Sequence, residues 1–175
     1  MNWKWFTNPV TKHPYLACYP EDLPKKVPHG IDKDGMFGGW SAYSEHIFLY
    51  ILAAGSPNPD FATGADSYYA MKTFKGSYKG ETFVFCGSGA AFTYQWTHAF
   101  IDFRNLRDKL DRDWFANSRH AGLAARQYAI DNAHRIKGLG PNSWGMSASI
   151  SPSTGYSGYY GSHPIGVGHK LLEDG

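Results

Sequence analysis

A short junction between polar and apolar residues constrains this chain more than any other feature. Residues 40–46 read Trp-Ser-Ala-Tyr-Ser-Glu-His, and residues 47–54, which follow directly, are all aliphatic or aromatic. A helix that is apolar on every face is typically buried on all sides. We therefore expect a buried helix over residues 41–54, with Ser41 as a plausible N-cap and Glu45 near its start.

Glu45 has two interpretations at this position. An unpaired buried charge is costly, so a carboxylate at the mouth of a buried helix faces either a partner or a cavity. That makes Glu45 a candidate for acid/base chemistry. The structural alternative is a helix cap, since the helix macrodipole favours acidic side chains in a first turn. Position alone leaves both interpretations open.

The size and charge of the chain exclude several classes of protein. Its 175 residues are enough for one domain with a core, and its formal net charge is +2. We expect no nucleic-acid partner, because the small net charge creates no strong electrostatic field. We expect no membrane partner, because no apolar stretch approaches the ~20 residues that a membrane helix needs. No signal peptide is expected at the N-terminus. We also expect no metal and no cofactor, and the pair Cys18 and Cys86 allows one disulfide or two free thiols.

The pattern of apolar, Gly and Pro residues predicts an all-α fold with long loops. Residues 1–39 are rich in Pro and Gly and predict irregular backbone, residues 40–135 predict a helical core, and residues 136–175 predict a loop-rich segment. The expected elements within the core are helices over 41–54, 63–74, 91–102 and 113–132 and a short β-hairpin with a Lys-Gly turn over 78–85.

Aromatic residues make up 17% of the chain, and many of them stand beside Gly, Ser or Asn. Flat rings fill cores, but they also form platforms for ligands such as pyranose rings. Trp144 lies in a loop flanked by Ser and Gly, where it either lines a binding site or plugs the edge of the core. The amide of Gln95 both donates and accepts hydrogen bonds, which suits a sugar hydroxyl.

Two charged patterns favour structural roles. His98 and Asp102 are four residues apart on a predicted helix, which favours a histidine oriented by a carboxylate. Asp102 and Arg104 are expected to join an ion pair at the end of that helix. Arg119 and Arg126 share a helix face, which favours a solvated or ion-paired surface.

Several motifs together resemble the bacterial glucoamylase-like family, whose members include endo-β-1,2-glucanases. Their order and spacing agree with that family over about residues 36–160. The motifs are Trp40 with Tyr43-Ser44-Glu45, the segment from Tyr50 to Pro57, Gln95-Trp96-Thr97-His98, Ile101-Asp102-Phe103-Arg104, the segment from Trp114 to Arg119, Ala124-Ala125-Arg126, and the segment from Asn142 to Ala148.

The resemblance implies an (α/α)6 toroid of helical hairpins around a sugar-binding cleft, and inverting hydrolysis of β-1,2-glucan by carboxylates. The catalytic glutamate of the family falls on Glu45. The resemblance therefore favours a catalytic role for Glu45 over the role of a helix cap. The same match implies five substrate-binding residues, namely Trp40, Tyr43, Gln95, His98 and Trp144.

The length of the chain predicts a partial domain. Six hairpins need twelve helices of about 11–12 residues each, and the pattern offers about four. We therefore expect residues 1–175 to form a single partial glucoamylase-like domain, with a second catalytic carboxylate outside this chain and a periplasmic or secreted full-length protein. The partner would be a glucan oligosaccharide or polysaccharide. Two alternatives stay open: a transglycosylase domain acting on β-1,2-glucan, and a non-catalytic glucan-binding remnant.

Overall fold

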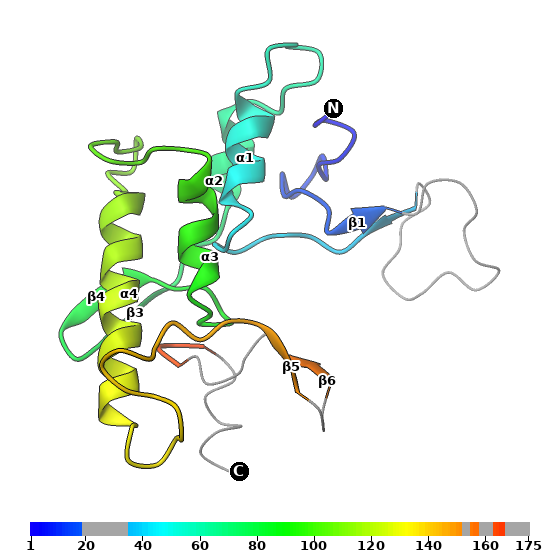
Figure 1. The fold of residues 1–175 in the computed structure, drawn as a ribbon. Coiled ribbons are helices and arrows are strands. Elements are labelled where there is room, and N and C mark those ends of the chain that lie inside the picture. The colour runs from blue at the N-terminus through cyan, green and yellow to red at the C-terminus, as the bar shows by residue number, and fades with distance from the viewer. Residues whose placement is uncertain (19–34, 152–154, 158–162, 167–175) are drawn as a thin grey trace. The chain divides into compact units, whose positions relative to one another are not determined.

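The computed structural model describes residues 1–18, 35–151, 155–157 and 163–166, and it is mostly helical with a few short strands (Figure 1). Its contacts divide the chain into two compact units. Unit 1 comprises Met1–Ala42 and His46–Lys72, and unit 2 comprises Tyr43–Glu45 and Thr73–Gly175. The three residues Tyr43–Glu45 thus belong to a different unit from the residues on either side of them.

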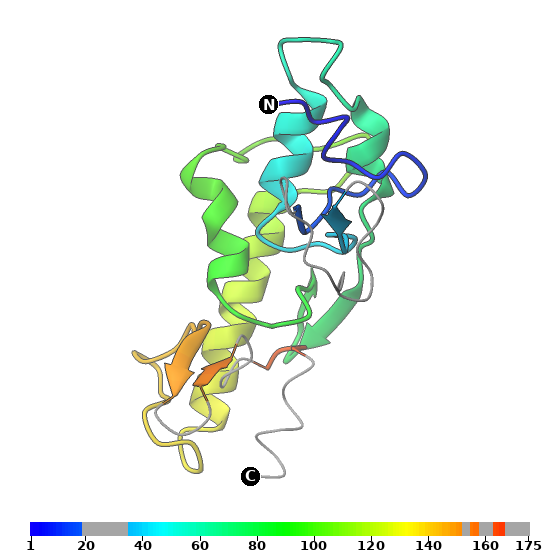
Figure 2. The same ribbon diagram turned by 90° about the vertical axis from the view of Figure 1, so that its right-hand side faces the viewer.

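Unit 1 is built on two short helices that pack side by side, α1 (Ile47–Ala54) and α2 (Ala65–Ala70) (Figures 1 and 2). The strands β1 (Ala17–Cys18) and β2 (Met36–Phe37) form a small antiparallel pair in the N-terminal segment. Helix α2 is shorter than the predicted helix over 63–74, and its N-cap is Gly64, whose side chain offers no cap.

Helix α1 begins later than predicted, and this changes the position of Glu45. Its N-cap is His46, without a side-chain cap, so Ser41 does not cap it. The reason is that Ser41 and Ala42 are bound to another segment: Ala42 pairs with Lys72 as a parallel bridge, and the Lys72 amide donates to the Ser41 carbonyl at 2.8 Å. The first turn of α1 holds no acidic residue, so Glu45 precedes the helix and is not its cap.

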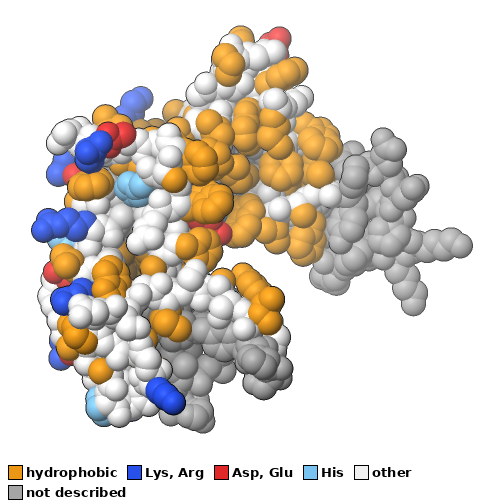
Figure 3. Space-filling model, viewed as in Figure 1, with side chains coloured by type: hydrophobic (Ala, Val, Ile, Leu, Met, Phe, Trp, Pro, Cys, Tyr) orange, Lys and Arg blue, Asp and Glu red, His pale blue; other side chains and the backbone are white. Residues whose placement is uncertain are grey.

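The prediction that this helix is buried on all sides is also wrong. Ile47, Tyr50 and Ala53 are buried, but they repeat every third residue and cover one face, while Leu52 is 41% exposed. Figure 3 shows hydrophobic side chains gathered over α1 and the N-terminal segment of unit 1. In the part of the chain that the structure describes, the six-residue α2 is too short to cover the remaining faces.

Unit 2 is organised by its longest helix, α4 (Trp114–Asp131), which confirms the helix predicted over 113–132. Asp113 is its N-cap, and the Asp113 carboxylate accepts a hydrogen bond from the Ala116 amide at 2.8 Å. Such a cap satisfies one of the amides that a helix start leaves unpaired.

The predicted hairpin is present beside this helix. Strands β3 (Lys75–Tyr78) and β4 (Glu81–Val84) are antiparallel and joined by Lys79 and Gly80, both at positive φ, as the tight turn requires. Asn117 of α4 clamps the end of β4: its Oδ1 accepts from the Val84 amide at 2.6 Å, and its Nδ2 donates to the Val84 carbonyl at 3.1 Å.

The predicted helix over 91–102 is present as two short pieces, α3 (Phe92–Gln95) and the 3-10 turn η1 (Trp96–Ala99). Aromatic and β-branched residues dominate this segment and propagate a helix weakly. Within the loop-rich segment, β5 (Ser149–Ser151) and β6 (Gly155–Ser157) form a small antiparallel pair that the sequence analysis did not predict.

Three further observations concern classes of function. Both Cys18 and Cys86 are free thiols in the structure. Among the described residues, no three His, Cys, Asp or Glu side chains come together as a metal site. None of the helices described is long and apolar enough to cross a membrane.

Candidate active site

Glu45 lies in the turn that precedes α1 and is anchored to η1 of unit 2. The hydroxyl of Thr97 donates a hydrogen bond to the Glu45 carbonyl at 2.9 Å. The Ser44 hydroxyl donates to Oε2 of the Glu45 carboxylate. These two bonds hold the residue in place, and because it is only half-buried it stays accessible to solvent.

Tyr43 is the second anchor of this turn. Its ring stacks on the Trp114 indole with ring centroids 4.7 Å apart and planes inclined by 5°, and the Tyr94 ring lies 6.0 Å away. The Tyr94 hydroxyl accepts from the Cys86 amide at 2.9 Å, and burial raises the pKa of Tyr94. Tyr43 is 4% exposed. This burial favours a supporting role, and its sugar contact stays a prediction.

The other described carboxylates of unit 2 have structural partners. Glu81 pairs with His120, Asp102 with Arg104, Asp108 with Arg112, Asp111 and Asp113 with Arg107, and Asp131 with Tyr78 and Gln127. Glu45 is the described carboxylate of unit 2 with neither a cation partner nor a helix to cap. It is therefore the one best suited to exchange a proton with a ligand.

Gln95 and His98, both predicted to bind substrate, lie at the same hollow between α3–η1 and α4. This hollow of about 220 Å³ is lined by Tyr94, Gln95, His98, Phe115, Ser118 and Arg119. The His98 Nε2 lies 2.8 Å from the Ser118 hydroxyl, and burial lowers the pKa of His98. A neutral imidazole at pH 7 can both donate and accept a hydrogen bond. Glu45 is not among the lining residues.

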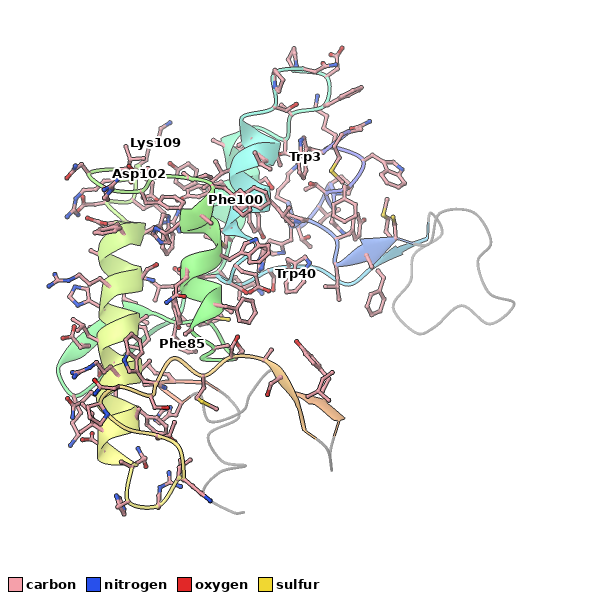
Figure 4. The ribbon with its side chains drawn as sticks, in the orientation of Figure 1. Trp3, Trp40, Phe85, Phe100, Asp102 and Lys109 are labelled. Atoms are coloured by element: carbon pink, nitrogen blue, oxygen red, sulfur yellow. The ribbon has the colours of Figure 1, made fainter. Side chains whose placement is uncertain are left out.

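The predicted pairing of His98 with Asp102 is present only as an electrostatic interaction, in which the charge of Asp102 raises the pKa of His98 against the larger effect of burial. The helical backbone ends at Ala99, so the four-residue spacing no longer places the two side chains on one face. Figure 4 shows Asp102 in the loop that follows η1. There it forms the predicted ion pair with Arg104, with an Nη2–Oδ2 distance of 2.7 Å, and this contact lowers the pKa of Asp102 to about 2. Ser118 orients His98 instead.

Trp144 lies at a different part of the α4 surface. It is 40% exposed and lines a narrow pocket with Ala125, Tyr128 and Met146. The loop that carries it is fixed at both sides, because the Arg126 guanidinium donates to the Pro141 carbonyl at 3.1 Å and the Ala91 amide donates to the Met146 carbonyl at 3.0 Å. An exposed ring in a fixed loop is compatible with the predicted ligand contact.

Trp40 belongs to unit 1 and is half-buried there (Figure 4). Its ring lies 4.6 Å from the His46 ring, and its carbonyl accepts from the Tyr50 hydroxyl. Burial lowers the pKa of His46 to about 4. The structure thus brings Gln95 and His98 together and anchors Tyr43 and Glu45 in the same unit, whereas the substrate-binding role of Trp40 stays a prediction.

Two hydroxyl residues of this region, Thr97 and Ser118, were not predicted as site residues. Each has a local signal: both stand within the aromatic motifs of residues 95–98 and 114–119, where a hydroxyl among large rings needs a hydrogen-bond partner. The partners themselves are 52 and 20 residues away in the chain, so sequence spacing does not reveal them.

Residues 38–173 match the Glycoamylase family model, described as "Putative glucoamylase", and the chain therefore belongs to this family. A comparison with curated proteins found no match.

Solved structures of similar fold agree with this assignment. Two proteins described as "putative glucoamylase", from Bacteroides caccae and Bacteroides uniformis, each align with a TM-score of 0.68, at 26% and 22% identity. A β-1,2-glucanase from Parabacteroides distasonis aligns with a TM-score of 0.67 at 18% identity. Each alignment covers 90% of this chain, but 37% of the two former proteins and 24% of the glucanase.

Proposed function

We propose that this chain belongs to a glycoside hydrolase that cleaves β-1,2-glucan by inversion, and that Glu45 is one of its two catalytic carboxylates. The observation that carries the proposal is the environment of Glu45. It is anchored through Thr97 and Tyr43, half-buried, and without a cation partner among the described residues of unit 2. The family membership supports the class of reaction.

The proposed mechanism needs two carboxyl groups. In inverting hydrolysis an acid protonates the glycosidic oxygen while a base takes a proton from the attacking water, and the two groups stand about 6.5–9.5 Å apart. Glu45 would hold the proton that passes to the leaving oxygen, or in the reverse assignment would accept the proton of water. The second carboxylate is predicted to lie outside this chain.

Substrate contacts are assigned to the predicted binding residues. Gln95 and neutral His98 would bond sugar hydroxyls at the hollow beside α4. Trp40 and Trp144 would offer ring faces on which pyranose rings stack. The β-1,2-glucanase of similar fold makes β-1,2-glucan the linkage to test first.

We further propose that the chain forms one part of an (α/α)6 toroid. It spans 37% of the "putative glucoamylase" chains that share its fold, so the other helices of such a ring would come from further polypeptide. A polysaccharide substrate of this kind also suggests a periplasmic or secreted location for the full-length protein.

The test is to incubate the full-length protein with β-1,2-, β-1,3- and α-1,4-glucans and to separate the products by chromatography. We expect shortened β-1,2-glucan, with turnover reduced by roughly 100-fold or more in Glu45→Gln, because an amide cannot exchange the proton. Asp111→Asn is the matched control, since Asp111 is an exposed carboxylate paired with Arg107. Transfer products in place of new reducing ends would indicate the transglycosylase alternative.

A non-catalytic glucan-binding role is the second candidate, and one observation favours it. All other described carboxylates of unit 2 are held by structural partners, so Glu45 has no second free carboxylate beside it among the described residues of that unit. This role predicts glucan binding without turnover, and binding that Glu45→Gln leaves unchanged in calorimetry.

A further inference from the structure

A largely buried ion pair precedes helix α4. Nε of Arg112 lies 2.5 Å from Oδ2 of Asp108, and the two side chains are only 13% and 10% exposed. Asp108 is fixed in turn, because its Oδ1 accepts from the amides of Leu110 and Arg112 at 2.8 and 3.1 Å. These bonds give the Arg112 side chain a defined position in front of helix α4.

The guanidinium of Arg112 lies over the indole of Trp114. Its central carbon is 5.1 Å from the ring centroid, within the range of a cation–π contact. The guanidinium is planar and pairs with Asp108 through Nε, so its orientation over the indole is determined by that pair. Lysine at this position could supply the positive charge, but it has no planar group that could lie parallel to the indole.

The indole of Trp114 in turn stacks on the ring of Tyr43, at 4.7 Å and nearly parallel. Tyr43 is two residues before Glu45 in the three-residue turn that belongs to unit 2. A second anchor of this turn is the hydrogen bond from the Thr97 hydroxyl to the Glu45 carbonyl. The direction in which the Glu45 carboxylate points therefore depends on where the Trp114 ring lies.

We propose that Arg112 is a positioning residue for Glu45, acting through the stacked rings of Trp114 and Tyr43, with Asp108 holding Arg112 in place. This inference rests on the proposed function of Glu45. It assigns a role in the reaction to a residue that is separated from the carboxylate by two aromatic rings. Arg112 itself touches neither substrate nor reacting atoms in this role.

The test that does not depend on turnover is NMR of the Tyr43 ring in protein labelled on tyrosine. A ring stacked on an indole has an upfield ring-current shift. We expect Arg112→Met to move this shift toward its random-coil value, and Arg112→Lys to move it part of the way. Tyr128, in the core between α4 and the hairpin, reports on the fold of unit 2 and is expected to keep its shift. Arg104→Met, which removes an exposed arginine of the same loop, is the control and is expected to change neither ring.

An unchanged Tyr43 shift in Arg112→Met would overturn the proposal. Equal loss of the Tyr43 and Tyr128 shifts would instead mean general unfolding of the variant. If Arg112→Met does not fold, Asp108→Asn serves in its place: it weakens the ion pair but keeps a side chain that accepts from the backbone. A displaced Tyr43 beside an unchanged Tyr128 is then expected, and an undisplaced Tyr43 contradicts the proposal.

The activity measurement separates this proposal from the proposed function. On β-1,2-glucan we expect Arg112→Met to lower kcat by on the order of 10- to 100-fold with KM nearly unchanged, and Arg112→Lys to recover part of the loss. A fall confined to KM would contradict a positioning role. If the protein with native Arg112 shows no turnover on any glucan, the proposed function fails, while the Tyr43 shift still decides whether Arg112 orders the turn.

Discussion

At the scale of single residues, the burial of His46 links the stability of unit 1 to pH. The side chain is 6% exposed, and desolvation lowers the pKa of His46 from 6.5 to about 4. The imidazole is therefore neutral in the folded protein throughout the range in which the unfolded chain already binds a proton. Between pH 6.5 and 4 the unfolded state holds more protons, so acidification destabilises the fold.

We predict that His46→Phe, which keeps a ring beside Trp40 but does not titrate, weakens this pH dependence. The free energy of unfolding changes by at most about 3 kcal/mol between pH 6.5 and pH 4 through this histidine, since one pKa unit corresponds to about 1.4 kcal/mol. Urea unfolding at pH 7 and pH 4.5 measures it, with the exposed His134→Asn as control. If the native protein and His46→Phe lose the same free energy on acidification, His46 is not the cause.

The candidate residues were predictable from sequence, but their contacts were not. Glu45, Gln95 and His98 stand in recognisable motifs, and the structure brings Gln95 and His98 to one hollow. The hydrogen-bond partner of His98 is Ser118 and not the predicted Asp102, because the helix ends at Ala99 before Asp102 is reached. Spacing arguments fail where a helix stops, since only regular backbone keeps residues four apart on one face.

At the scale of secondary-structure elements, Asn117 joins α4 to strand β4. Its side chain bonds both the amide and the carbonyl of Val84, and both residues are buried. A strand end would otherwise present unpaired polar groups to the core. The hairpin and the helix therefore depend on one side chain for their connection at this point.

We predict that Asn117→Ala destabilises unit 2 by about 2–3 kcal/mol, because it leaves two buried backbone groups of Val84 unsatisfied. Urea denaturation gives the free energy, and hydrogen exchange of the Val84 amide shows whether the loss is local. Asn142→Ala, an exposed asparagine in a loop, is the matched control. A loss for Asn117→Ala no larger than that of the control would show that the clamp contributes nothing.

Elements with strong local signals were predicted well, and those governed by tertiary contacts were not. Helix α4 has a capping Asp113 and good helix formers, and it lies where it was predicted. The Lys-Gly turn of the hairpin also lies as predicted, although β3 begins at Lys75, before the predicted residues 78–85. Residues 41–46 were predicted to begin the helix, yet Ala42 forms a bridge to Lys72 and the helix begins only after His46. A pairing partner 30 residues away overrides the local helix propensity, and no local sequence pattern predicts such a partner.

At the scale of the whole molecule, the exposed face of α1 is the feature with the widest consequence. The helix carries an aliphatic or aromatic side chain at every position, while burial is confined to Ile47, Tyr50 and Ala53. Exposed apolar surface of this kind typically marks an interaction site or leads to association. In the proposed toroid, neighbouring helices would cover it.

We predict that the 175-residue chain self-associates with rising concentration through this face. Leu52→Lys is expected to reduce the association, because Leu52 is 41% exposed, and Leu123→Lys on α4, at 42% exposure, is the control. Sedimentation velocity over a concentration series measures both. A chain that stays monomeric at every concentration, or one in which both substitutions act alike, would contradict the prediction.

The assignment of Glu45 is tested by the rate at which the full-length protein shortens β-1,2-glucan, with and without Glu45→Gln. We predict that the native protein releases shorter β-1,2-linked oligosaccharides and that Glu45→Gln lowers the rate by roughly 100-fold or more while glucan binding persists. Turnover that survives Glu45→Gln, at a rate close to that of the Asp111→Asn control, would contradict the assignment of Glu45 as a catalytic carboxylate.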